Sequence, residues 1–62
     1  MTTVRYWRQA LRAEAERLFC VAWSLRAQAL AARDLAVRCA LLGVVAMLVD
    51  QAAAIEERAE AS

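Results

Sequence analysis

The chain has 62 residues, so it forms one domain at most, and an isolated core of this size is usually supplemented by a metal, by disulfides or by self-association. It contains no His, only two Cys without Cys-x-x-Cys spacing, and no Gly-rich phosphate loop, so we predict no metal, no cofactor and no catalytic site, and we do not expect an enzyme. The net charge of +1 is unevenly placed, because residues 1–38 hold seven of the eight Arg and residues 39–62 hold four of the seven acidic residues.

The composition predicts an all-α fold, made of a single helical module over residues 1–62. Hydrophobic residues make up 63% of the chain, and sixteen of them are Ala, the residue with the highest helix propensity. There is no Pro and only one Gly to interrupt a helix, and the β-branched residues recur at helical spacing instead of alternating with polar ones. The use of Arg without Lys, together with the many Ala, indicates a GC-rich genome and therefore a bacterial or phage source.

The first predicted helix spans about residues 4–32, and residues 1–3 are assigned to its N-terminal cap. Thr2 or Thr3 would supply the hydroxyl that accepts a hydrogen bond from a free amide in the first turn. Apolar residues then recur at steps of three and four, within one narrow face of the helix. This stripe consists of Val4, Trp7, Leu11, Ala15, Leu18, Ala22, Leu25 and Ala29.

A second group of side chains lies on the flank beside this stripe, basic in its N-terminal half and aromatic in its C-terminal half. Arg and Trp dominate the energetics of protein interfaces, and Arg also contacts phosphates while aromatic rings stack on bases. We therefore predict that this flank binds a partner; the alternative is a solvated charged flank with two aromatic rings tucked into a bundle. The candidate residues are Arg5, Arg8, Arg12, Phe19, Trp23 and Arg26.

The apolar stripe changes register near residues 32–34, which predicts a turn. Asp34 is the predicted N-cap of a second helix over about residues 34–59, with Arg38 as its ion-pair partner. If the chain reverses at residue 33, residues whose numbers sum to 66 lie level, so Leu18 faces Leu48 and Ala22 faces Val44. Both apolar stripes then meet along their length, which favours an antiparallel two-helix hairpin. The alternative is one long or kinked helix.

The second predicted helix is apolar on nearly every side as far as Val49, and its longest uninterrupted apolar run is Cys39–Val49. Such a helix is buried on more than one side, either in an oligomer or in lipid. We therefore expect the hairpin to self-associate into a helical bundle, and residues 60–62 to fray. The predicted core and oligomer interface comprises Leu18, Leu25, Val37, Leu41, Leu42, Val44, Leu48, Val49 and Ile55.

One side of the second helix carries small residues. Cys39, Ala40 and Gly43 include the small-x-x-x-small spacing that allows two helix backbones to approach closely, so we predict a close helix contact there. In a hairpin the thiols of Cys20 and Cys39 lie too far apart along the axis for a disulfide, and we predict that both are small buried hydrophobic residues.

These patterns predict a small, cytoplasmic, non-enzymatic interaction or regulatory protein that forms a homodimer or higher oligomer and binds a protein partner, with a phage or a plasmid as its candidate source. The first alternative is a single-pass or interfacial membrane protein, holin-like or an accessory subunit, in the inner membrane with its N-terminus inside. Its apolar run of eleven residues forms about 16 Å of helix against about 30 Å of hydrocarbon. The second alternative is a hairpin that binds RNA or DNA, which Glu14, Glu16 and the low net charge make the weaker hypothesis.

Overall fold

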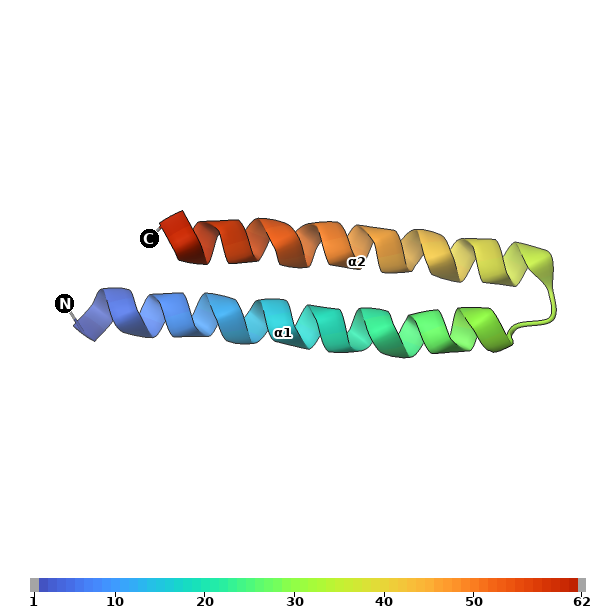
Figure 1. Ribbon diagram of the computed structural model, residues 1–62, viewed down its shortest axis with the longest axis horizontal. Helices are drawn as coiled ribbons and strands as arrows, with labels where there is room; N and C mark the ends of the chain where they lie inside the picture. The colour runs from blue at the N-terminus through green and yellow to red at the C-terminus, as the bar shows by residue number, and fades with distance from the viewer. Residues whose placement is uncertain (1, 62) are drawn as a thin grey trace.

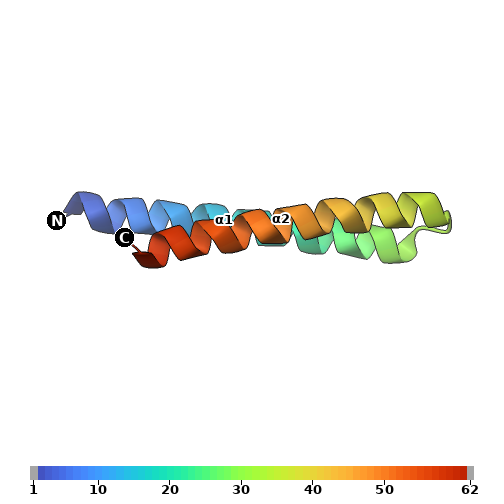
Figure 2. The ribbon, with the colours of Figure 1, turned by 90° about the horizontal axis from the view of Figure 1, so that it is seen from above.

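The computed structural model describes residues 2–61 and consists of two α-helices, α1 (Thr2–Ala31) and α2 (Leu35–Ala61), joined by a short turn. Figure 1 shows the helices side by side and antiparallel, and Figure 2 shows that they cross at a small angle. The two helices pack along a rod 51 Å long, and no strand occurs among the described residues. The predicted all-α hairpin is therefore confirmed, and the alternative of one long helix is excluded.

Compared with the predicted bounds of 4–32 and 34–59, the helices extend two residues further at the chain ends and stop one residue short at the turn. The first helix begins at Thr2, within the segment that the sequence assigned to an N-terminal cap, and the second continues through Glu60 and Ala61, within the segment that was expected to fray. The outermost residues of these two segments, Met1 and Ser62, lie outside the described residues.

The turn is held by hydrogen bonds at the facing ends of the two helices. The Asp34 carboxylate accepts the backbone amides of Ala36 at 2.8 Å and Val37 at 3.4 Å, so Asp34 is the N-cap of α2, as predicted. The predicted ion pair between Asp34 and Arg38 is wrong, because the Arg38 guanidinium instead donates to the Ala32 carbonyl oxygen at 2.8 Å. That carbonyl lies just beyond the end of α1, where a helix leaves its acceptors free. No non-Gly residue among those described has a positive φ, which explains why no Gly marks the turn.

The core is a single line of contact between the helices, which we call the seam. Its positions alternate in steps of three and four on both helices, the heptad spacing of a coiled coil. With Phe19 added, they are all the residues within 3–61 that are not exposed. The seam consists of Arg8, Leu11, Ala15, Leu18, Ala22, Leu25 and Ala29 on α1, Ala32 just beyond the end of α1, and Arg38, Leu41, Val45, Leu48, Ala52, Ile55 and Ala59 on α2.

Small and large residues alternate along the seam. The most deeply buried side chains are all Ala, and Ala29, Ala52 and Ala59 have 0% exposure. Methyl groups at these positions let the two helix backbones approach closely, since the distance between packed helices depends on the side chains at the contact. The larger residues lie beside the line of closest approach and remain half-buried, except for Leu18, which joins Ala15 and Ala52 in the central cluster. No large side chain among the described residues is completely buried.

The apolar stripe expected on α2 consists of Val37, Leu41, Val44, Leu48 and Ile55, and it differs from the seam at two positions. Val37 is 48% exposed and Val44 is 43% exposed, and Val45 replaces Val44 in the seam. The physical reason lies in the residues that follow at heptad spacing. The line through Val44 continues into Gln51 and Arg58, whereas the line through Val45 continues into Ala52 and Ala59, which pack closely. The predicted pairing of Ala22 with Val44 is therefore wrong by one residue.

The α1 stripe also ends earlier than expected. Val4 and Trp7 are exposed, although the sequence predicted that they continue the apolar face. Val4 keeps the heptad spacing of Leu11, but it lies at the far end of the rod, where α2 stops at Ala61 and offers no residue to cover it. Trp7 lies beside the seam rather than on it, because the seam position is taken by Arg8.

We predict that the seam does not accommodate a larger side chain at its buried alanines. Ala52→Leu should lower the free energy of unfolding by about 1–3 kcal/mol, because the helices must separate to admit the added carbons. The matched control is Ala54→Leu, an exposed position two residues away, which should change it by less than about 0.5 kcal/mol. Urea unfolding followed by circular dichroism at one protein concentration compares the two. An equal effect of both substitutions would contradict the close contact.

We also predict that Asp34 stabilises the hairpin through its cap hydrogen bonds. Asp34→Ala should lower the free energy of unfolding by about 1 kcal/mol, whereas Asp34→Asn should retain most of it, because an Asn side chain caps a helix as well as Asp does. The same urea experiment measures both variants. A loss in the Asn variant as large as that in the Ala variant would assign the effect to the charge of Asp34 instead.

Candidate interaction surface

Two open clefts lie between the helices on one side of the rod, which we call the cleft face. The first has a volume of about 280 Å³ and is lined by Arg12, Ala15, Glu16, Phe19, Glu56 and Glu60. The second, nearer the turn, has a volume of about 240 Å³ and is lined by Phe19, Ala22, Trp23, Arg26, Val45 and Val49. Phe19 lines both clefts, so the two sites form one continuous surface.

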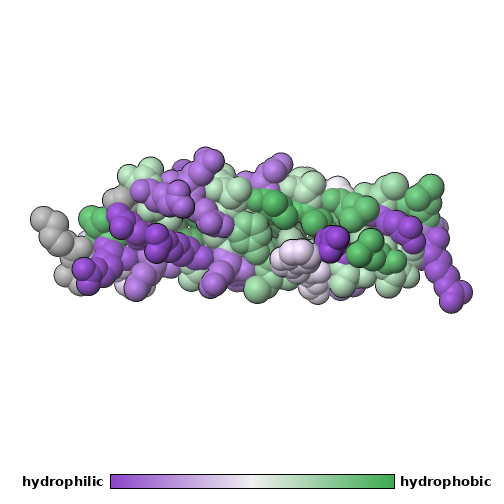
Figure 3. Space-filling model, viewed as in Figure 1, coloured by the Kyte–Doolittle hydropathy of each residue, from purple (hydrophilic) through white to green (hydrophobic). Residues whose placement is uncertain are grey.

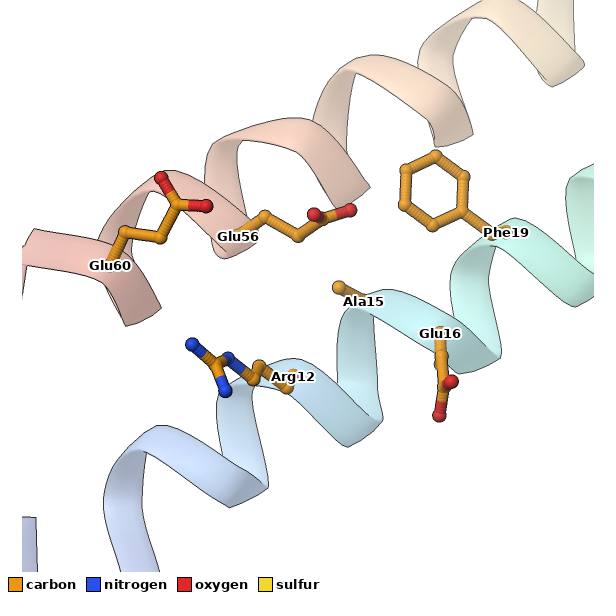
Figure 4. Close-up of a pocket in the computed structure, with 6 residues that line it drawn as sticks. All are labelled: Arg12, Ala15, Glu16, Phe19, Glu56 and Glu60. Atoms are coloured by element: carbon orange, nitrogen blue, oxygen red, sulfur yellow. The ribbon is translucent and has the colours of Figure 1, made fainter. Parts of the chain in front are cut away.

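The first cleft brings opposite charges together across the two helices. In Figure 4 the Arg12 side chain rises from α1 beside Ala15 toward the side of the cleft where Glu56 and Glu60 project from α2, while Glu16 points away from α2. Neither α2 carboxylate comes within ion-pair distance of Arg12 in the hairpin. The cleft therefore presents a cation on α1 and two anions on α2 to whatever covers it.

The second cleft is mainly apolar. Trp23 is 63% exposed, and the Arg26 guanidinium carbon lies 5.1 Å from the centre of its ring, a cation–π contact. A contact of this kind at an exposed site contributes about 0.5–1 kcal/mol. Phe19 and Val49 complete an apolar surface between the helices. Arg26 covers part of this surface without closing it.

Polarity is divided along the length of the rod. Figure 3 shows hydrophilic residues gathered over the half that holds the chain ends, and hydrophobic residues over much of the half toward the turn. An exposed apolar patch of this extent usually marks an interaction site. Exposed large hydrophobic residues occur on both helices: Val4, Tyr6, Trp7, Val21, Trp23, Leu30, Leu35, Val37, Leu42, Val44, Met47 and Val49.

The predicted partner-binding flank is largely, but not completely, on the cleft face. Arg12, Phe19, Trp23 and Arg26 line its clefts, and Arg5 lies seven residues before Arg12, on the same side of α1. The prediction from the sequence did not include Glu56 and Glu60 of α2, which share this face. The signal that could have placed them there is their spacing, because Glu56 lies seven residues after Val49 and Glu60 four residues further on.

Arg8 does not belong to this flank. It is half-buried in the seam, and its Nε is buried without a hydrogen-bond partner. Along α1 it occupies the heptad position that Ala15, Ala22 and Ala29 occupy further on. The apolar stripe and the basic flank are neighbours on α1, and Arg8 lies at their border. Its charge favoured the flank, whereas its heptad spacing indicates the seam.

The small-residue side of α2 is not covered by α1. Cys39, Ala40 and Gly43 are exposed, and a Cβ added at Gly43 would meet no atom within 4 Å. Cys20 is exposed as well, and both thiols are free, so the prediction that they are buried is wrong for the hairpin by itself. A close contact at these residues requires a second chain and stays a prediction.

The ion pair with the clearest geometry lies on the opposite side of α1 from the cleft face. Arg17 donates hydrogen bonds of 3.1 and 2.6 Å to Glu14, and they hold the pKa of the Glu14 carboxyl below its ordinary value. Both side chains are exposed, so this pair supports the helix and carries no chemistry. Within residues 2–61, no three His, Cys, Asp or Glu side chains come together as a metal site would require.

Comparison of the sequence with protein-family models, and of the chain with curated proteins and with solved structures, found no match. The helix α2 is long and apolar enough to cross a membrane, and only 6% of its most apolar segment is buried in the hairpin.

We predict that Arg8 weakens the seam. Arg8→Leu should raise the free energy of unfolding by about 1 kcal/mol, because it replaces an unpartnered polar group with an apolar side chain at a half-buried position. Arg5→Leu, at the exposed position three residues earlier, should change it by less than about 0.5 kcal/mol. Urea unfolding at matched protein concentration measures both. A loss of stability in Arg8→Leu would show that the guanidinium has a partner that stabilises the fold.

Proposed function

We propose that this chain is a small non-enzymatic interaction protein that self-associates through its exposed apolar surface into a helical bundle and, in that form, binds a partner protein. It acts by occupying a surface of that partner, in the cytoplasm of a bacterium or of a phage-infected cell. The single observation that carries the proposal is the exposure of α2, of whose most apolar segment only 6% is buried by α1.

The size of the core supports this proposal. Among residues 3–61, the buried hydrophobic side chains are five Ala and Leu18, so the amount of apolar area removed from water is small. A chain of this length with such a core gains its stability from association. The larger side chains that a bundle would bury, among them Trp23, Leu42 and Val49, are already on the surface.

The charges of the cleft face favour a protein partner over a nucleic acid. Arg12 and Arg26 are interleaved there with Glu16, Glu56 and Glu60. A nucleic-acid surface gains affinity from an undiluted row of cations along the phosphate backbone. Mixed charges around an aromatic centre are instead typical of the rim and centre of a protein interface.

Membrane insertion is the second candidate, because α2 has the length and hydropathy of a spanning helix. Its apolar run is bounded by Arg38 on one side and by Asp50 on the other. Arg38 also donates a hydrogen bond to the turn, where it stays at the end of the rod. A spanning α2 would have to carry Asp50 into the hydrocarbon or leave the bilayer locally thinned.

We predict that the purified chain forms one defined oligomer in buffer without detergent, and that Leu42→Asp disrupts it. Leu42 is 38% exposed and lies outside the seam, so a carboxylate there leaves the hairpin intact but opposes burial against another chain. Sedimentation velocity over a range of protein concentrations measures the mass, and circular dichroism reports the helix content.

Ser24→Asp is the matched control, because Ser24 is exposed and lies seven residues after Arg17, on the side of α1 opposite the cleft face. This variant should keep the mass of the original protein. A folded monomer at all concentrations would refute self-association. A protein that becomes monodisperse only in detergent or on lipid vesicles would favour the membrane candidate.

A further inference from the structure

We propose that the cleft face binds a second copy of this chain, with both turns at the same end of a four-helix dimer and α1 of each copy against α2 of the other. This inference depends on the proposed function, since it names the first partner of the surface. It follows from three observations: the division of polarity along the rod, the opposite charges of the two helices, and the sizes of the facing side chains.

The seam determines which residues of the two helices lie level. Leu18 and Leu48 belong to one packed cluster, Arg12 and Glu56 line one cleft, and Phe19 and Val49 line the other. A second copy rotated by 180° about an axis parallel to the rod keeps every level and exchanges α1 with α2. Each pair that is level within one chain then meets again between the two chains.

The division of polarity selects this rotation over the one that reverses the rod. With both turns at one end, the apolar half of each cleft face covers the apolar half of the other (Figure 3). A full overlap with turns at opposite ends would place Phe19 and Trp23 against the charged half that holds Arg12 and Glu56. Burial of those charges against apolar side chains is unfavourable, because it removes their water without providing a partner.

The charges are complementary in the same arrangement. On the charged half, α1 contributes Arg12 and α2 contributes Glu56 and Glu60 (Figure 4). Since α1 of one copy lies on α2 of the other, Arg12 of each copy meets an acidic pair of its partner, twice in the dimer. These side chains form no ion pair within the hairpin and are available for one between chains.

The facing side chains also complement each other in size. Trp23 lies on α1 four residues after Phe19, on the outer edge of the cleft face. The corresponding outer edge of α2 carries Cys39, Ala46 and Ala53, which are small, exposed and spaced by seven residues. In the register that pairs Leu18 with Leu48, Ala46 lies within one helical turn of the level of Trp23, so the indole of each copy extends over the small residues of its partner.

The available area is sufficient for a stable dimer. A standard interface buries about 800 Å² on each partner, which is about one sixth of the 4891 Å² surface of the hairpin. One long face of the rod can supply that area. Val37, Val44 and Met47, which lie outside the cleft face, stay uncovered and are available to a different protein.

A charge exchange between two variants tests the facing pair. Arg12→Glu and Glu56→Arg should each weaken dimerisation by about tenfold at low salt, since each places like charges across both contacts. An equimolar mixture of the two variants should dimerise as well as the original protein, because both contacts then join opposite charges. Sedimentation equilibrium at low salt measures all three samples. The matched control Glu57→Arg, exposed one residue away, should leave dimerisation unchanged.

The mixture separates effects between chains from effects within one chain. If the variants are weakened only because Arg12 and Glu56 face each other inside each hairpin, mixing cannot restore dimerisation, and that result would overturn the proposal. Restored dimerisation in the mixture supports it. Circular dichroism shows whether each variant is folded before mixing.

Spin labels at the turn test the orientation, and the only change they require at the proposed interface is Cys39→Ser, which replaces one small side chain with another. Arg33→Cys is labelled in a chain that also carries Cys20→Ser and Cys39→Ser, and the distance between labels is measured by pulsed electron resonance. Turns at one end should place the labels within about 20 Å, the width of two packed helices. A separation near the 51 Å length of the rod would overturn this arrangement while leaving self-association intact. A monomeric hairpin would overturn both proposals.

Discussion

The close packing of the helices along a seam of buried alanines is the constraint on which the rest of this structure depends. Ala15 on α1 and Ala52 on α2 share the central cluster, Ala22 and Ala29 continue the seam toward the turn and Ala59 toward the chain ends, and these side chains are almost completely removed from water. A methyl group fills little space, so the helices pack closely but bury little apolar area. The hairpin is therefore well defined in geometry and small in core, and its larger apolar side chains are left on the outside.

The small side chains in the seam explain why large apolar residues lie on the surface. Once alanines hold the helices together, Trp23, Leu42 and Val49 are not needed inside the hairpin and remain exposed. Trp23 and Val49 line the half of the cleft face toward the turn, and Leu42 lies seven residues before Val49 on the same side of α2, whereas Arg12, Glu56 and Glu60 lie on the other half. A second layer of helices would cover both halves, apolar against apolar and cation against anion, which supports the proposal that the hairpin is one half of a larger bundle.

An arginine lies near each end of the seam. Arg38 lies at the turn end and bonds the Ala32 carbonyl, and Arg8 lies near the chain ends with its Nε unpartnered. Long side chains of this kind cover apolar surface with their methylenes while the charged group reaches the edge. The contact between the helices therefore ends at an arginine on each side. Neither helix changes direction there, and the sequence has no Pro that would bend a helix.

The sequence by itself determined the all-α class, the turn near residue 33, the Asp34 cap and the line from Leu11 to Ala29, because helix propensity, capping and heptad spacing are local properties. Only the tertiary structure decided that Val45 rather than Val44 enters the seam, that Arg8 leaves the basic flank, and that Glu56 and Glu60 share a face with Arg12. These outcomes depend on how closely two helices approach each other. That distance is set by pairs of residues far apart in the chain.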